Sequence, residues 1–459
     1  MKLIYEVSSK PKFIQLVFFA IQQMLAILAA TIAVPAIVGN GLTPATAMFG
    51  AGVGTLVYLF FTKRRSPVFL GSSFAFIGSM FAAFAGGVSM SLGMLGLVIG
   101  AFFAGLVYVV ISIVIRYTGV RWLNRLMPAV IIGPTVAIIG LSLARNAISD
   151  LTRIDVVPQN GSAAPSYVAL LCGIVTLFVT MLCSTYGKKM AKLIPFILGI
   201  LAGYAVASLF TVIGYACEIE SFRVIDFSIF GKYMFANGGL SLSSFVSVPD
   251  FVFIHAFQGI SELNATYVAT IFVAYTPVAF VVFAEHVADH KNLSTIINKD
   301  LLKKPGLSRT LRGDGVGSFV GAFFGGCPNT TYGESIACVA ITGNASTITI
   351  FAAAIGCILF SFITPLVAFV DSIPACVMGG VCIALYGFIA VSGLKMLQRV
   401  NLDRNRNLFV ASTIFISGIG GLTITVGAVT LTSIAASLIL GIIVNAMLSG
   451  EKYEEENQF

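Results

Sequence analysis

Charged residues are scarce in this sequence. Asp, Glu, Lys and Arg together make up 10% of the 459 residues, and hydrophobic residues make up 58%, with a mean hydropathy of +0.98. A soluble domain carries about a quarter charged residues, so this composition cannot give several soluble domains a charged surface. The 46 glycines are typical of helices in lipid, where small residues let two backbones approach closely. The composition therefore indicates an integral membrane protein.

Motifs for catalysis and for metal binding are missing as well. The sequence has no HExxH, no DDxxD and no Ser–His pair inside its apolar stretches, so we do not expect an enzyme. Its eight cysteines form no CxxC pair and lie mostly in apolar stretches, which is typical of small buried side chains rather than ligands. His286 and His290 lack a third ligand at metal spacing. We therefore expect neither a metal ion nor a cofactor.

Long apolar stretches dominate the sequence instead. The first twelve residues are polar and do not resemble a cleaved signal peptide, so we expect a retained first span. Eleven stretches are near the length needed to cross a bilayer, and they lie at about 13–39, 44–62, 88–115, 127–144, 166–186, 190–216, 265–288, 348–370, 374–394, 406–424 and 430–449. Three shorter stretches lie near 67–85, 315–326 and 327–342. If these also cross, the chain has fourteen membrane segments and both termini lie on one side.

The distribution of basic residues supports this count. With fourteen segments, 23 of the 27 Lys and Arg residues fall on the side of the termini, which the positive-inside rule assigns to the cytoplasm. With a different number of short segments, the Lys and Arg residues would be divided between the two sides of the membrane. The net charge of +8 therefore indicates topology, and we do not expect nucleic-acid binding. The sequence predicts a multi-pass protein of the cell (inner) membrane with both termini cytoplasmic.

The two halves of the sequence show a weak internal repeat. Residues 127–133 (MPAVIIG) and 373–379 (IPACVMG) each open an apolar stretch, and each half also contains an irregular short segment, at 71–76 and at 328–334. Seven segments in each half would make the repeats inverted in the membrane. Interrupted segments at matching positions of two such halves indicate the binding site of a transporter.

Carboxylates inside membrane segments are costly and usually functional. Glu285 and Asp289 are four residues apart at the end of the stretch 265–288, so they share one helix face. Glu285 follows twenty uncharged residues, and we interpret it as functional. Asp289 is either functional or paired with Lys291 at the membrane interface.

Two further aspartates flank predicted spans. Asp314 opens the short stretch 315–326, where it either caps that helix or takes part in ion coupling. Asp371 lies at a helix end before Ser-Ile-Pro, and we interpret it as an interfacial cap.

The irregular segments are rich in turn formers and hydroxyl groups. Extended backbone at membrane depth is tolerated only where it is buried in protein or faces a cavity, and residues 325–334 and 72–74 fit that description. The two extended stretches would cross each other near the middle of the membrane, and each would lead into a half-helix. The positive end of each half-helix would point at this crossing and could bind a polar solute. The Phe74 ring would offer a stacking face. Together with Glu285 and Glu334, this arrangement suits a flat, hydrogen-bonding heterocycle better than a bare ion or a sugar.

Four motifs carry a resemblance to a known family. AEHVADH at 284–290, PNTTYGES at 328–335, GSSFAF at 71–76 and IALYG at 383–387 resemble the nucleobase–ascorbate transporter family, in its bacterial uracil permease branch. The resemblance covers nearly the whole chain.

The resemblance implies an all-α membrane fold of fourteen segments in a seven-plus-seven inverted repeat, with short strands in segments 3 and 10. A core domain would comprise residues 1–121 (segments 1–4) and 263–372 (segments 8–11). A gate domain would comprise residues 122–262 (segments 5–7) and 373–459 (segments 12–14). Relatives often dimerise through the gate domain, so a homodimer is one expectation.

The same resemblance implies a substrate site. Glu285 and Glu334 would accept hydrogen bonds from ring N–H groups, and Phe74 would stack on the base. The other implied substrate residues are Asp289, Tyr332, Gly333 and Tyr386, of which Tyr332 and Gly333 would present backbone groups.

Some residues depart from the family pattern. Ser335 and Ala337 replace the usual Asn and Gly, and Gln23 stands where many relatives have His. Glu334 favours uracil, whereas Gly343, which replaces the Arg common in uracil carriers, is shared with carriers of xanthine and urate.

We predict proton-coupled import of uracil or a related nucleobase by alternating access. Glu285 is the candidate proton carrier, with Asp289 and Asp314 as relay members, and sodium is the alternative coupling ion. The alternative functions are a purine (xanthine or urate) permease and an anion exchanger of the same architecture. An anion exchanger has little use for buried carboxylates.

Overall fold

The computed structural model of the chain describes residues 3–119, 122, 126–154, 166–188, 190–235, 239–426 and 429–449. Eight helices in this part of the chain are long and apolar enough to cross a membrane, counting α6 and α7 as one. They are α1 (Phe13–Val38), α2 (Pro44–Phe61), α4 (Met90–Thr118), α6 with α7 (Ala129–Ser142 and Ala144–Leu151), α8 (Tyr167–Tyr186), α10 (Pro195–Ala216), α13 (Ala265–Ile297) and α18 (Ala375–Leu397). Each corresponds to an apolar stretch that the sequence predicts. The cytoplasmic positions predicted for Lys2, Arg121, Arg125, Lys189 and Lys452 lie outside the described residues.

The other described α-helices are shorter or more polar. They are α3 (Ile77–Ala83), α9 (Met190–Leu193), α11 (Ser228–Met234), α12 (Val252–Gln258), α14 (Leu307–Gly325), α15 (Gly333–Thr342), α16 (Thr347–Phe360), α17 (Thr364–Asp371), α19 (Asn405–Ile419) and α20 (Ser433–Met447). Between α19 and α20 the chain forms a hairpin of β3 (Ile424–Val426) and β4 (Val429–Leu431).

Helix α14 begins earlier than the sequence predicts. It starts at Leu307 rather than at residue 315, directly after Gly306, whose φ is 97°. Arg309 and Arg312 lie inside the helix. Because the sequence prediction relies on apolar length, it leaves out the part of the helix that carries these charges. Asp314 is therefore an interior residue, and the interpretation of Asp314 as a helix cap is wrong.

The stretch predicted as one span over 348–370 is two helices. Helix α16 ends at Phe360, and α17 begins at Thr364 with a proline in its first turn, where the missing N–H of proline costs nothing. Asp371 is the last residue of α17, and its carboxylate accepts a hydrogen bond from the Tyr233 hydroxyl. Asp371 thus bonds a side chain of α11 rather than a helix end, and its interpretation as a cap is wrong.

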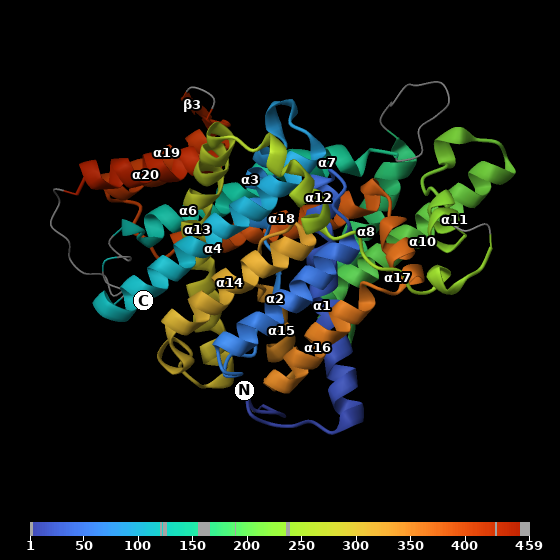
Figure 1. The fold of residues 1–459 in the computed structure, drawn as a ribbon, viewed down its shortest axis with the longest axis horizontal. Coiled ribbons are helices and arrows are strands. Elements are labelled where there is room, and N and C mark those ends of the chain that lie inside the picture. Colours follow the sequence, from blue (N-terminus) through green and yellow to red (C-terminus); the bar gives the residue numbers. More distant parts are fainter. Residues whose placement is uncertain are drawn as a thin grey trace.

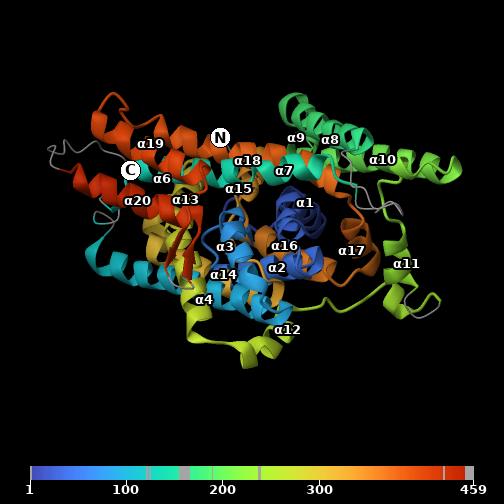
Figure 2. The same cartoon turned by 90° about the horizontal axis from the view of Figure 1, so that it is seen from above.

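The helices pack in two sets (Figure 2). In the first set, α2 and α4 pack on both sides of α14, α16 packs on α1 and α2, and α13 packs on α4. In the second set, α18 packs against α6, α7 and α8, while α10 packs on α8, and α19 packs on α6 and α20. Along the long axis, α19 and α20 lie at one end of the molecule and α10 and α11 lie at the other (Figure 1).

Two three-residue strands meet inside the first set. Strand β1 (Leu70–Ser72) and strand β2 (Asn329–Thr331) pair antiparallel, with Gly71 opposite Thr330. The ladder continues beyond the strands, because Ser73 N donates to Pro328 O at 2.8 Å. Strand β1 leads into a 3-10 turn and α3, and β2 leads into α15. Two half-helices therefore start from one buried strand pair, in the segments that the sequence predicts to be extended.

Glycines hold β2 against the helix pair α2 and α14. The Asn329 side chain donates from Nδ2 to the carbonyl of Gly50 at 3.0 Å. A Cβ atom on Gly321 would lie 2.1 Å from Asn329 Nδ2, and one on Gly54 would lie 2.6 Å from the same atom. Only glycine leaves room for this amide, so the close approach of α2 and α14 anchors the start of β2.

The chain before α1 lies over the connection between α15 and α16, and we call residues 3–9 the N-terminal strap. Ile4 N and Tyr5 N both donate to the carbonyl of Gly343, at 2.8 and 3.2 Å, and Ala345 N donates to Tyr5 O at 2.9 Å. Gly343 has a φ of 66°, which favours glycine. An arginine at this position would have to adopt a left-handed backbone conformation beside Ile4.

Candidate solute-binding site

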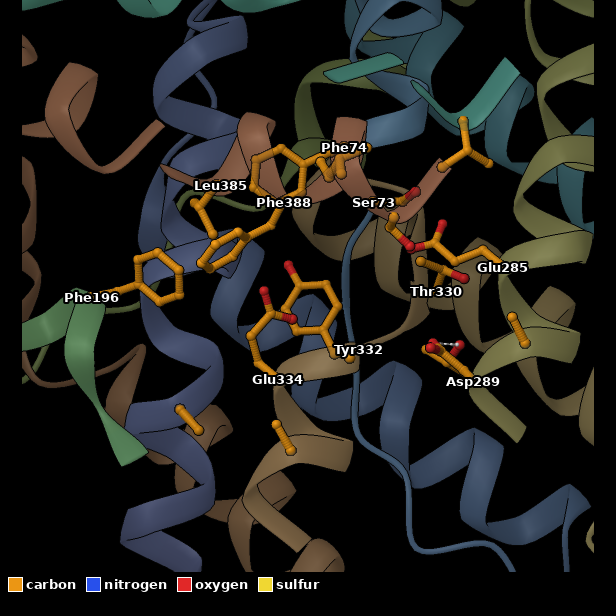
Figure 3. A pocket seen from close by; sticks show the side chains of 18 of the residues that line it. Ser73, Phe74, Phe196, Glu285, Asp289, Thr330, Tyr332, Glu334, Leu385 and Phe388 are labelled. Atoms are coloured by element: carbon orange, nitrogen blue, oxygen red, sulfur yellow. Dashed lines mark hydrogen bonds between the residues drawn. The ribbon is translucent and has the colours of Figure 1, made fainter. Parts of the chain in front are cut away.

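A cavity of about 460 Å³ lies between the two sets of helices (Figure 3). Strand β2, the residues that follow β1, α13 and α15 line one side of it, and α6, α10 and α18 line the other. Its volume is within the range of about 300–1,000 Å³ that is common for small-molecule sites. The extended segments and the acidic end of α13, which the sequence indicates separately, meet in this cavity.

Helix α13 contributes two carboxyl groups. Glu285 and Asp289 are one turn apart and both line the cavity, as their spacing predicts. Asp289 Oδ2 accepts a hydrogen bond from the hydroxyl of Thr331 in β2 at 2.7 Å. This bond ties α13 to the strand pair and directs the Asp289 carboxyl toward the cavity.

Helix α15 contributes a third carboxyl group at its N-terminus. Glu334 is in the first turn of this ten-residue helix, and Gly333 is its first residue. Both line the cavity, and Gly333 is exposed there. Tyr332 precedes the helix in extended conformation, with its hydroxyl donating to Ser72 O at 2.7 Å. The N-terminus of the helix and the positive end of its dipole therefore face the cavity.

Phe74 and Tyr386 occupy different positions. The Phe74 ring lines the cavity, directly after β1. Tyr386 packs edge-on against it, with ring centroids 6.0 Å apart, and is buried behind it rather than lining the cavity. On α18, Leu385, Phe388 and Ile389 face the cavity, and at helical spacing Tyr386 points away from that face.

Three lining side chains could not be singled out from the sequence. Phe196 of α10 and Phe388 of α18 pack edge-on, with centroids 6.0 Å apart, and form an aromatic wall of the cavity. Neither belongs to a recognised motif. Thr330 of β2 also lines the cavity, and its position in the motif PNTTYGES is the signal that could have identified it.

The cavity carries more negative than positive groups. Among its lining residues, Glu285, Asp289 and Glu334 have carboxyl side chains, and Lys192 of α9 has the only cationic one. Buried like charges repel each other, so this lining opposes the binding of an anion and favours a solute that donates hydrogen bonds.

Two departures from the family pattern are in contact. Gln23 of α1 donates from Nε2 to the hydroxyl oxygen of Ser335, and Phe69 N donates to the same oxygen at 3.1 Å. Ser335 is fully buried. It therefore joins α1, the backbone before β1 and α15, and does not reach the cavity.

A smaller cavity of about 260 Å³ lies on the other side of Phe74. Both cavities are lined by Phe74 and by Ile139 of α6, so these two side chains stand between them. The residues that line only the smaller cavity are Gly78, Phe81, Ser142, Leu143, Asn146, Thr432, Ser433 and Ile434.

Asp314 lies behind the cavity rather than in it. Its carboxyl group is fully buried on α14, and its Oδ2 is 2.6 Å from Nδ1 of His286 on α13. The residue before His286 is Glu285, so the pair lies directly behind the acidic face of the cavity. The sequence predicts Asp314 as a relay residue but gives no role to His286.

The fold and the site together define a multi-pass membrane protein with a small acidic cavity between two sets of helices. Comparison with known proteins gives its family. The sequence profile of the Permease family matches residues 14–427, and the chain belongs to this family. It is 35% identical over 463 residues to a uracil permease of Bacillus caldolyticus, covering 100% of this chain and 98% of that protein. It is 34% identical over 438 residues to the uracil permease of Escherichia coli K12, covering 95% and 92%.

These relatives confirm the resemblance that the four motifs indicate. The fold is also similar to the solved transmembrane domain of BicA, a cyanobacterial bicarbonate transporter. The TM-score is 0.63 at 13% identity, covering 96% of this chain and 100% of that one. At this identity the likeness concerns the fold alone.

Proposed function

We propose that this permease imports uracil by proton-coupled symport. The observation that carries the proposal is the meeting of three carboxyl groups, a helix N-terminus and an aromatic face in one cavity of about 460 Å³. The relatives named as uracil permeases support the same substrate over the full length of the chain.

Uracil offers two ring N–H donors and two carbonyl acceptors, and each has a counterpart in the cavity. Glu285 and Glu334 accept from the N–H groups. The backbone N–H groups at the junction of β2 and α15, beginning with Gly333, donate to the carbonyls. Phe74 stacks on the ring, as aromatic side chains do on bases. Tyr386 acts by holding the Phe74 ring rather than by contacting the base.

Glu285 carries the proton. It lies in a membrane helix within a group of carboxyl residues that one lysine cannot neutralise, and such sites favour a carboxyl that exchanges a proton. Asp289, one turn away, shares this role through its position in the cavity.

Fourteen segments in a seven-plus-seven inverted repeat provide alternating access. Strand β1 belongs to segment 3 and β2 to segment 10. The core (residues 1–121 and 263–372) moves against the gate (residues 122–262 and 373–459), which also provides the dimer surface if two copies associate. The positive-inside bias places both termini in the cytoplasm and the protein in the inner membrane.

The two cavities support an inward-facing state. The larger cavity extends to Lys192 and Met396, near basic segments predicted to be cytoplasmic. The smaller cavity extends to Asn146 and Thr432, near the opposite side. Phe74 and Ile139 close the passage between them, so the substrate site is open toward the predicted cytoplasm.

Two alternatives predict different behaviour. A purine permease would transport xanthine through the same site, and Gly343 is the residue that favours it. Xanthine should compete with labelled uracil in proteoliposomes only if purines are substrates. An anion exchanger of the same fold would place anions against Glu285 and Glu334, which the charge of the cavity opposes.

The test is the variant Glu285→Gln in proteoliposomes. A gradient of about one pH unit supports about tenfold accumulation of uracil when one proton accompanies each base. We expect Glu285→Gln to lose this accumulation, because an amide neither binds nor releases the proton. The matched control is Glu262→Gln, since Glu262 is exposed and accepts a hydrogen bond from Ser89 at 2.8 Å. Full accumulation by Glu285→Gln would refute the proton role.

A further inference from the structure

His286 and Asp314 form a fully buried pair that the substrate contacts leave unused. His286 Nδ1 lies 2.6 Å from Asp314 Oδ2, and both side chains are 0% exposed. On the other side of the ring, His286 Nε2 lies 3.0 Å from the hydroxyl oxygen of Thr310. Both ring nitrogens are therefore engaged in hydrogen bonds.

One arrangement of protons satisfies all of these contacts. When the Thr310 hydroxyl donates to Leu307 O, which lies 3.1 Å away, its oxygen accepts from His286 Nε2–H. The contact between Nδ1 and Oδ2 needs one further proton, which either atom can carry. The pair thus holds one shared proton and is neutral as a whole, as deep burial favours.

One oxygen of the pair remains open. Among the described residues, Asp314 Oδ1, Thr330 Oγ1 and the Tyr108 hydroxyl are buried without a short, well-aligned hydrogen bond. The Thr330 hydroxyl is nevertheless within reach of both Asp314 and Tyr108. A buried polar atom without a hydrogen bond costs free energy. A proton on Asp314 Oδ1, in addition to the one shared with His286, would provide a donor for these oxygens.

Thr330 connects this oxygen to the substrate cavity. Thr330 and Glu285 both line the cavity, and the Thr330 side chain is also next to the Tyr108 hydroxyl. Asp314 itself does not line the cavity. The Thr330 hydroxyl is thus a polar group that adjoins both the cavity that holds Glu285 and the buried pair.

Other titratable groups surround the pair. The charge of Asp314 acts on Tyr58 and Tyr108 of α2 and α4, and on Glu285 and Asp289 of α13. The His290 ring stacks on His286 with centroids 4.1 Å apart, but its nitrogens are engaged with His286 O at 2.8 Å and the Tyr58 hydroxyl at 2.7 Å.

We propose that the His286–Asp314 pair is a second proton site, which receives the transported proton from Glu285 through the Thr330 hydroxyl. The O–H bond of the Glu285 carboxyl breaks, the Thr330 oxygen takes that proton, and the former Thr330 proton bonds to Asp314 Oδ1. Glu285 becomes a carboxylate, and the pair gains one positive charge. The ionised Glu285 can then accept a uracil N–H while the positive pair behind it balances its charge. This inference rests on the proposed proton-coupled function.

The relay is tested with two substitutions of one residue in proteoliposomes. Thr330→Val keeps the shape of the side chain and removes the hydroxyl, whereas Thr330→Ser keeps the hydroxyl. We expect Thr330→Ser to accumulate uracil as the parent does. We expect Thr330→Val to equilibrate uracil to a ratio of about one, because a carrier without coupling builds no gradient. Equal accumulation by both variants would overturn the relay.

The proton site is tested with Asp314→Asn. We expect this variant to exchange internal for external uracil, which needs no net proton movement, but to lose accumulation driven by the proton gradient. Asp371→Asn is the control, since Asp371 bonds Tyr233, away from the pair. Accumulation by Asp314→Asn equal to that of the parent would overturn the proposal.

A measurement on the unaltered protein covers the case in which these variants do not fold. The chain has three histidines, and ¹⁵N-histidine NMR with ¹³C-labelled aspartate identifies His286 by its contact with a carboxyl. With uracil bound, both His286 nitrogens should be protonated, and a neutral His286 ring in the bound state would refute the transfer.

If the parent itself fails to accumulate uracil, the proposed function fails. If the parent accumulates uracil and only the variants or the NMR spectra disagree, the second proton site alone fails.

Discussion

At the scale of single residues, the site combines groups that the sequence identifies with groups that it does not. Glu285 could be predicted because twenty uncharged residues precede it, and burial of a carboxyl is a local property of such a stretch. Phe196 and Phe388 could not, because they reach the cavity only through the packing of α10 against α18. Asp314 could be predicted as a candidate, but its partner His286 could not, since no spacing rule relates α13 to α14.

Phe74 gives a prediction at this scale. Stacking of a base on an aromatic ring is worth about 1–3 kcal/mol, so Phe74→Ala should weaken uracil binding by about 5- to 150-fold. Isothermal titration of the purified protein measures this change. Phe81→Ala is the control, because Phe81 lines only the smaller cavity. Equal weakening by both variants would show that Phe74 does not stack on the base.

At the scale of elements, apolar length predicts the long helices and fails for the mixed ones. Helices α1 and α4 could be located because a long apolar stretch in lipid has to satisfy its backbone internally. The sequence does not predict the first residues of helix α14, because Arg309 and Arg312 interrupt its apolar pattern. The pairing of β1 with β2 could not be derived either, since it depends on the amide of Asn329 fitting between glycines of two separate helices.

That fit gives a prediction for the α2–α14 contact. A methyl group on Gly321 would lie 2.1 Å from Asn329 Nδ2, and overpacking of this kind costs about 1–3 kcal/mol. Gly321→Ala should therefore lower the thermal stability of the purified protein and impair uptake. Gly387→Ala is the matched control, because a Cβ there meets nothing within 4 Å. Unchanged stability of Gly321→Ala would mean that the strand is not anchored by this contact.

At the scale of the whole molecule, two cavities lie on either side of Phe74 and Ile139. The family and the multi-pass class could be predicted from motifs and composition. The separation of the cavities at Phe74 and Ile139 could not, because it depends on the arrangement of one set of helices relative to the other. The smaller cavity lies where α3 approaches α6 and α20.

The closed contact between α3 and α20 beside the smaller cavity can be tested by crosslinking. A Cβ on Gly78 of α3 would lie 3.8 Å from Ile434 Cδ1 of α20. The double variant Gly78→Cys, Ile434→Cys, treated with a short reversible thiol crosslinker, should lose uptake and regain it on reduction. Each single variant under the same treatment is the control. Uptake that survives crosslinking would contradict a movement between α3 and α20.

The pairing of β1 with β2 also has a consequence for biosynthesis. Leu70 lies opposite Thr331, so the first strand has no partner until the ribosome has made most of the chain. Its unpaired backbone groups are costly in a bilayer, and the nascent protein must shelter them during insertion. The substrate site is consequently one of the last parts of the molecule to form, and the first half of the chain on its own would lack it.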